Sequence, residues 1–188
     1  MYLDPSKGPG EYSKTYVFAH KNYDDIIHGI RNGRIFVTLG DLISELYITV
    51  RSSISEADMG GTAEVERGGS VEITIRFLDP DVPNASGQNP SVGRVDLIVG
   101  HVTRPVLDRS ADTNLTTRVE ARFTKDDWVT EGQYRTITYL FENVDSDSYI
   151  RIRGTNTDEL EPESDLMGED PWSDLWFYSN PVFLEIKD

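Results

Sequence analysis

The sequence contains no cysteine, few basic side chains and no long apolar run. Without cysteine there are no disulfide bonds, thiol nucleophiles or thiolate metal sites. The 18 Lys and Arg side chains stand against 33 Asp and Glu, which gives a formal net charge of −15. Affinity for nucleic acids and for anionic membranes comes mainly from Lys and Arg. We therefore expect neither a nucleic acid nor a membrane as a partner.

Helical periodicity is also scarce. Only the stretch from Tyr23 to Asn32 places apolar residues on one helical face, at Tyr23, Ile26, Ile27 and Ile30. Asn22 is a favourable N-cap, and Gly33 is well placed to end the helix. The pattern predicts one short helix between a strand at 14–19 and a strand that starts at residue 35.

Period-two alternation dominates the rest of the chain and predicts about nine or ten half-buried strands. Loops rich in Gly, Pro and polar residues separate them, the longest at 79–93, 104–116 and 154–174. We predict a mostly β fold, an immunoglobulin-like antiparallel β-sandwich preceded by a short strand–helix–strand segment. The expected core comprises Leu46, Ile48, Val50, Val71, Ile73, Ile75, Phe77, Val95, Leu97, Val99, Val119, Phe123, Ile137, Tyr139, Phe141, Ile150, Ile152, Leu184 and Ile186.

Two short motifs lie near opposite ends of the chain. The first is Arg31-x-Gly33-Arg34-x-Phe36-Val37-Thr38, and the second is Tyr178-Ser179-Asn180-Pro181. Together with their flanking residues, 9–40 and 171–186, they resemble the carboxy-terminal part of PHP-type (polymerase and histidinol phosphatase) metal-dependent phosphoesterases. The middle of the chain matches that family mainly in its strand pattern.

The resemblance implies a fragment without a catalytic centre. Members of the family bind catalytic metal ions through H-x-H and D-x-H motifs, and His20, His28 and His101 form neither. Residues 1–41 would then be a linker and a strand–helix–strand remnant of the catalytic domain, and residues 42–188 an accessory β-sandwich. We expect no catalytic residue and no cofactor in this chain, since the divalent metals would belong to the missing domain.

The implied partner is the protein's own amino-terminal catalytic domain. In the isolated chain, the apolar residues of 13–38 would dock on the sandwich or mediate a homodimer, because exposed apolar patches favour association. We expect no phosphoester hydrolysis from these residues alone.

One acidic segment raises the question of calcium. Asn143, Asp145 and Asp147 space oxygen ligands as a calcium loop does, but the Gly and Glu that an EF-hand needs are Ser148 and Gly154 here. Two interpretations stay open: a solvated acidic loop, or a looser calcium site at Asp145 and Asp147.

The alternative function is an independent binding module for a carbohydrate or a cell-surface partner. Trp172 and Trp176 would stack on a sugar in that case, whereas Trp176 would otherwise anchor the last strand in the core. The first ten residues lack the pattern of a signal peptide, and we expect them to be the start of a fragment. Among compartments, a bacterial periplasmic or extracellular location is favoured.

Overall fold

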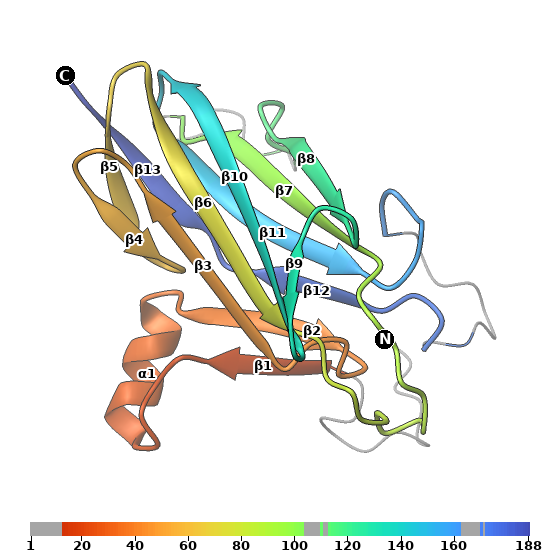
Figure 1. The fold of residues 1–188 in the computed structure, drawn as a ribbon. Helices are drawn as coiled ribbons and strands as arrows, with labels where there is room; N and C mark the ends of the chain where they lie inside the picture. Colours follow the sequence, from red (N-terminus) through yellow and green to blue (C-terminus); the bar gives the residue numbers. More distant parts are fainter. Residues whose placement is uncertain (1–12, 104–109, 111–112, 163–169, 171) are drawn as a thin grey trace.

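The computed structural model describes residues 13–103, 110, 113–162, 170 and 172–188. They form two β-sheets packed face to face, with one short helix at one end (Figure 1). This confirms the predicted mostly β sandwich with a strand–helix–strand segment before it. The immunoglobulin-like subtype stays a prediction. No helix in the described part of the chain is long and apolar enough to cross a membrane.

The smaller sheet has five strands in the order β4, β3, β6, β10, β9, all antiparallel. Inward-facing residues align across neighbouring strands, as in the row of Ile48, Ile75 and Ile137, which are all buried. The strands are β3 (Glu45–Arg51), β4 (Glu56–Asp58), β6 (Gly69–Leu78), β9 (Val129–Glu131) and β10 (Tyr134–Val144).

The larger sheet has eight strands around a central β11. On one side β11 pairs with β7, which pairs with β8; on the other it pairs with β12 and β13, which lie end to end along it. Beyond β12 come β2 and β1, and beyond β13 comes β5, the one parallel neighbour. The strands are β1 (Ser13–Val17), β2 (Ile35–Leu39), β5 (Thr62–Glu66), β7 (Arg94–His101), β8 (Arg118–Thr124), β11 (Ser148–Thr155), β12 (Trp176–Ser179) and β13 (Val182–Lys187).

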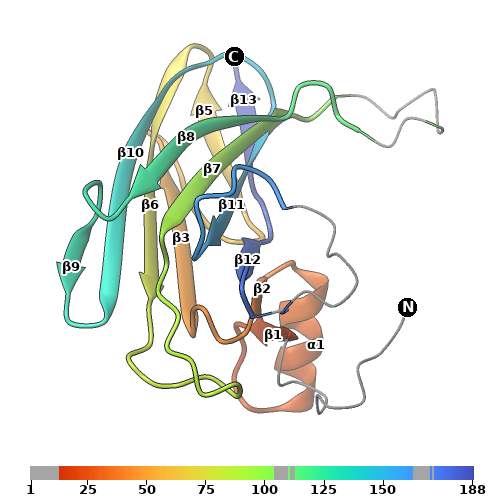
Figure 2. The same cartoon turned by 90° about the vertical axis from the view of Figure 1, so that its right-hand side faces the viewer.

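The core fills the space between the two sheets, which Figure 2 shows from the side. The residues expected there are buried, except that Val119, Tyr139 and Ile186 are only partly buried. Phe36, Leu42 and Ile43 add to this core from the segment that joins the first strands to the sandwich.

The N-terminal unit consists of β1, α1 (Tyr23–Arg31) and β2. The helix begins where predicted, because the side chain of Asn22 accepts a hydrogen bond from the Asp25 backbone N–H at 2.9 Å. It ends before Gly33, whose φ of +67° favours glycine. β2 then joins the larger sheet beside β12. The predicted domain boundary after residue 41 falls between β2 and β3, and the division into two domains stays a prediction.

Candidate functional site

The two sequence motifs from opposite ends of the chain are neighbours in the structure. β2 pairs with β12, with Phe36 opposite Ser179. Just beyond this ladder, the backbone N–H of Asn180 donates to the carbonyl of Ile35 at 3.1 Å. The hydroxyl of Ser179 also accepts a hydrogen bond from the Ile152 N–H at 2.8 Å. The second motif therefore ties the N-terminal unit to the central strand of the larger sheet.

The end of α1 makes close backbone contact with the β4–β5 turn. A Cβ atom added to Gly60 would lie 2.1 Å from the carbonyl oxygen of Asn32, and one added to Gly33 would lie 3.0 Å from the side-chain nitrogen of Asn180. The Gly60 N–H donates to the carbonyl of Pro181 at 2.9 Å. Because no larger residue fits at Gly60 without displacing backbone, α1 is held at one place against the sandwich.

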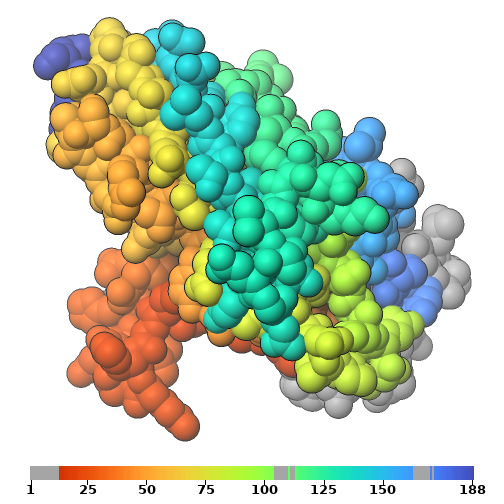
Figure 3. All heavy atoms as spheres, viewed as in Figure 1, coloured from red at the N-terminus to blue at the C-terminus, as the bar shows by residue number. Residues whose placement is uncertain are grey.

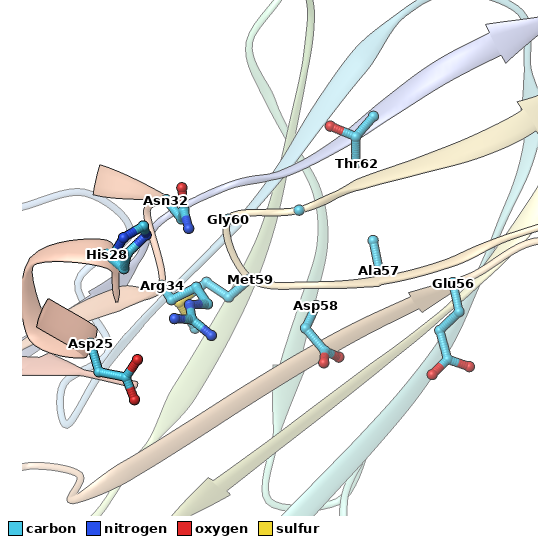
Figure 4. Close-up of a pocket in the computed structure, with 11 residues that line it drawn as sticks. Asp25, His28, Asn32, Arg34, Glu56, Ala57, Asp58, Met59, Gly60 and Thr62 are labelled. Carbon is cyan, nitrogen blue, oxygen red and sulfur yellow. The ribbon is translucent and has the colours of Figure 1, made fainter. Parts of the chain in front are cut away.

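Two clefts follow the junction between the N-terminal unit and the smaller sheet, and together they form what we call the junction groove. Its larger part, of about 630 Å³, lies between α1 and the β4–β5 turn (Figure 4). Its smaller part, of about 340 Å³, lies against β3. In the space-filling view the N-terminal unit projects at the lower left, and the surface is hollowed where it meets the sandwich (Figure 3). Arg34, Asp58 and Met59 line both parts and make the groove continuous.

The helix presents its polar side to the junction groove. Asp25, His28 and Asn32 line the larger part, at positions i, i+3 and i+7. Tyr23, Ile26 and Ile30 have the same spacing but start two residues earlier. At 3.6 residues per turn, two residues correspond to a rotation of about 200°. The apolar stripe of Tyr23, Ile26 and Ile30 therefore faces away from the groove.

The apolar stripe of α1 is uncovered in the described structure. Tyr23 is 79% exposed, Ile30 47% and Ile26 39%. The helix meets β1 mainly at Gly29, where an added Cβ would lie 2.7 Å from a side-chain methyl carbon of Val17. A surface helix normally turns its apolar stripe toward the core, so α1 has the opposite orientation.

The carboxylates of the junction groove have hydrogen-bond partners of their own. Asp25 accepts from the His20 N–H at 3.2 Å, and Asp58 accepts from the Thr49 hydroxyl at 2.7 Å. The guanidinium of Arg34 is exposed and makes no ion pair with any described residue. Arg34 is thus the free cationic donor at the point where the two parts of the groove meet.

An aromatic wall and a free strand edge border the smaller part of the groove. Phe18 and Tyr47 lie with ring centroids 5.5 Å apart, and Tyr47 is 41% exposed. The Tyr47 hydroxyl donates to Glu45 at 2.8 Å, and this hydrogen bond is the main reason that the pKa of Tyr47 is raised. β3 pairs with β6 along residues 45–51, but β4 covers its other edge only at residues 49–51. Among the described strands none pairs with that edge at residues 45–48.

The predicted calcium residues lie at the opposite end of the sandwich from α1, in the β10–β11 turn. Both side chains are exposed. One oxygen of the Asp147 carboxylate accepts a hydrogen bond from the Ile186 N–H at 2.9 Å, and the backbone carbonyl of Asp145 accepts one from Arg67. Within the described ranges no group of three or more His, Asp or Glu side chains is arranged to hold a metal ion. Calcium binding at Asp145 and Asp147 stays a prediction.

The three histidines do not come together. His20 follows β1, His28 lies on α1, and His101 ends β7. The Nδ1 atom of His101 lies 2.8 Å from the hydroxyl oxygen of Ser146. Of the three, only His28 lines the junction groove.

The outer face of the larger sheet carries an ionic cluster that the sequence analysis missed. Asp96 on β7 is 1% exposed and accepts hydrogen bonds from Arg94 at 2.9 Å and from Arg153 at 3.0 Å. Arg153 also makes a bidentate contact with Glu161, at 2.6 and 2.8 Å. This contact lowers the pKa of Glu161 below its usual range.

Residues 159–161 cover this ionic cluster. Arg153 donates to the carbonyl of Leu160 at 2.9 Å, and Arg94 donates to the carbonyl of Glu159. Trp176 lies below both arginines, 2% exposed, and its ring is stacked on Tyr178. Trp176 therefore offers no open face to a sugar. The ionic cluster had one signal in the sequence, which is that two charged residues alternate with the apolar residues of β7.

No protein-family model, no curated protein and no solved structure matches this chain. The resemblance to PHP-type phosphoesterases therefore rests on the sequence patterns at 9–40 and 171–186 and stays a prediction.

Proposed function

We propose that this chain is a non-catalytic accessory β-sandwich of a PHP-type metal-dependent phosphoesterase, and that it packs on the catalytic domain of the same protein. The two motifs on which the resemblance rests support this, because they form a single hydrogen-bonded junction between Phe36 and Ser179, which are 143 positions apart in the sequence. That junction fixes the orientation of α1 relative to the sandwich.

The observation that carries the proposal is the outward apolar stripe of α1. Tyr23, Ile26 and Ile30 lie at helical spacing on the side that faces away from the junction groove, and all three are exposed. A contiguous exposed apolar patch marks an interaction surface. In the proposed protein, the catalytic domain covers this stripe.

The charge of the N-terminal unit is in keeping with an interface. Residues 13–38 carry four Lys and Arg side chains against two Asp, whereas the whole chain has a net charge of −15. The high negative charge of the sandwich repels other acidic surfaces and opposes their close approach. The N-terminal unit lacks that repulsion, so close approach of another domain costs least there.

Within the described residues no group of three or more His, Asp or Glu side chains is placed to serve metal-assisted hydrolysis. Such a reaction needs ligands that hold a cation with an open position and lower the pKa of a bound water. The three histidines lie on separate elements. In the proposed protein, the divalent metals and the catalytic ligands belong to the other domain.

The test compares this chain with the longer polypeptide that the proposal predicts for its gene. The reading frame upstream of Met1 is determined, and both proteins are purified and assayed with Mn²⁺, Zn²⁺ or Mg²⁺ against a phosphate monoester and a phosphate diester. We expect H-x-H and D-x-H motifs upstream, hydrolysis by the longer protein and none by residues 1–188. An upstream frame without these motifs contradicts the proposal, as does turnover by the short chain that His20→Ala or His28→Ala abolishes.

A further inference from the structure

We propose that the smaller part of the junction groove is a binding site for a single sugar ring, presented by a glycan or a glycoside. This inference does not depend on the accessory role proposed above. It concerns the cleft that is lined by the apolar or aromatic side chains of Phe18, Tyr47 and Met59 and by the polar side chains of Arg34, Thr49 and Asp58.

The size and the lining of the cleft fit a small ligand. Its volume is about 340 Å³, which is at the small end of the range for ligand sites in proteins. Such sites combine mostly apolar walls with a few convergent polar groups. Of the lining residues, Met59 is buried and Tyr47 is 41% exposed.

The aromatic wall suits the apolar face of a pyranose ring. A sugar ring turns C–H groups outward on one face, and these pack against the negatively charged face of an aromatic ring. The hydroxyl of Tyr47 is held by Glu45, and the guanidinium of Arg76 lies 6.0 Å from its ring centroid. These contacts fix the ring before a ligand arrives, which lowers the entropy lost on binding.

The polar wall suits vicinal hydroxyl groups. Arg34 offers five N–H donors in a planar fork and has no ion-pair partner among the described residues. Asp58 uses one carboxylate oxygen on Thr49, and no described donor bonds the other. A donor fork and a carboxylate oxygen in one cleft can together satisfy hydroxyl groups, which both donate and accept. The same pair disfavours an anion, which Asp58 repels, and a cation, which Arg34 repels.

The surroundings add backbone groups and room for a longer ligand. The edge of β3 at residues 45–48, which no described strand pairs with, places backbone donors and acceptors beside the cleft. The larger part of the groove continues past Arg34 toward His28 and Asn32. A second sugar unit would extend in that direction.

The test uses the whole chain and the methyl glycosides of glucose, galactose, mannose and N-acetylglucosamine as probes. Saturation-transfer NMR detects binding, and titration calorimetry measures the affinity of any glycoside that binds. We expect at least one glycoside to bind, with Tyr47→Ala and Arg34→Gln each weakening its affinity about tenfold or more. Tyr47→Phe keeps the ring and should retain most of the affinity.

Two matched variants separate the cleft from its neighbourhood. Tyr23→Ala removes an exposed tyrosine of α1 that lines neither part of the groove, and Arg31→Gln removes an exposed arginine of α1 outside the groove. Both should leave the affinity unchanged. The proposal is overturned if none of the four glycosides gives a signal, or if binding survives Arg34→Gln and Tyr47→Ala. Arg34 is exposed, so its variant stays informative even if Tyr47→Ala destabilises the fold.

Discussion

The ionic cluster of the larger sheet buries charged side chains, whereas the helix α1 exposes apolar ones. Asp96, Arg94 and Arg153 are charged yet buried, because residues 159–161 return over them and complete their hydrogen bonds. The apolar stripe of α1 has no such cover within the described residues, and Tyr23 is 79% exposed. The ionic cluster completes its hydrogen bonds within its own chain, so a role in the stability of the fold is enough to explain it. A region that leaves apolar groups in water calls for a partner.

The largest effect should come from breaking the ionic cluster at its centre. Asp96→Ala leaves the guanidinium groups of Arg94 and Arg153 buried without their shared carboxylate. Removing one partner of a buried ion pair costs about 3–5 kcal/mol. Urea unfolding followed by circular dichroism measures the loss. A change smaller than about 1 kcal/mol would mean that water reaches the cluster and that its burial is not what stabilises it.

The second-largest loss of stability should come from the contact between the end of α1 and the β4–β5 turn. Gly60→Ala forces a side chain into a positive-φ position with the Asn32 carbonyl oxygen 2.1 Å from the added atom. Backbone strain and overpacking together should cost about 3 kcal/mol. Gly68→Ala is the matched control, since Gly68 also has a positive φ but nothing within 4 Å of an added Cβ. It should cost about 1 kcal/mol, from strain alone. An equal fall in melting temperature for the two variants would show that the end of α1 is not in close contact with the β4–β5 turn.

The core and the helix could be predicted because their signals are local. Ile73, Ile75 and Phe77 alternate with polar residues on one strand, and that period fixes which face is buried. For α1, the cap at Asn22 and the glycine at position 33 mark both ends within a few residues. The resulting fold class needed no information about distant contacts.

The ionic cluster and the junction groove could not be predicted in the same way. Arg94 and Asp96 alternate with Val95 and Leu97, so their positions are those of solvent-facing residues. They are buried among Arg153, Trp176 and residues 159–161, all of which come more than fifty residues later in the chain. Likewise, Gly60 gives the signal of a turn, but its contact with the end of α1 depends on how two separate segments meet.

A smaller effect should come from the rim of the ionic cluster, and it should depend on pH. The pKa of Glu161 is lowered because Arg153 hydrogen-bonds its carboxylate, so the unfolded chain takes up this proton at a higher pH than the folded chain. The stability from this pair is therefore complete above the ordinary pKa of 4.5 and is lost as the pH falls through the lower, folded pKa.

Glu161→Gln is the variant that measures this contribution. Because Glu161 is 63% exposed, solvent weakens the pair, and we expect a loss of about 1 kcal/mol or less at pH 7. The difference between the two proteins in urea-unfolding free energy should shrink between pH 5 and pH 3. A difference that stays constant over that range would mean that the pair with Arg153 does not form in solution.

The smallest effect on stability should come from the stripe of α1. Tyr23 is 79% exposed and Ile30 47%, so replacing both by serine removes little buried apolar surface. Serine has nearly the same helix propensity as tyrosine and isoleucine, so the double variant Tyr23→Ser/Ile30→Ser tests exposure rather than helix formation. We expect unfolding free energy to change by about 1 kcal/mol or less, while binding of a hydrophobic fluorescent dye falls.

The melting temperature gives the deciding control for this stripe. If it is free in the isolated chain, the melting temperature of the unmodified protein does not depend on protein concentration. If a second copy covers it, the melting temperature rises with concentration, and the double serine variant abolishes that rise. That second result would establish the homodimer through residues 13–38. The apolar stripe of α1 would then be covered by a second copy of the chain, and α1 would no longer differ from the ionic cluster in being uncovered. If the melting temperature does not depend on concentration and the serine variant keeps nearly the same unfolding free energy, the stripe is free in the isolated chain and remains available for another domain.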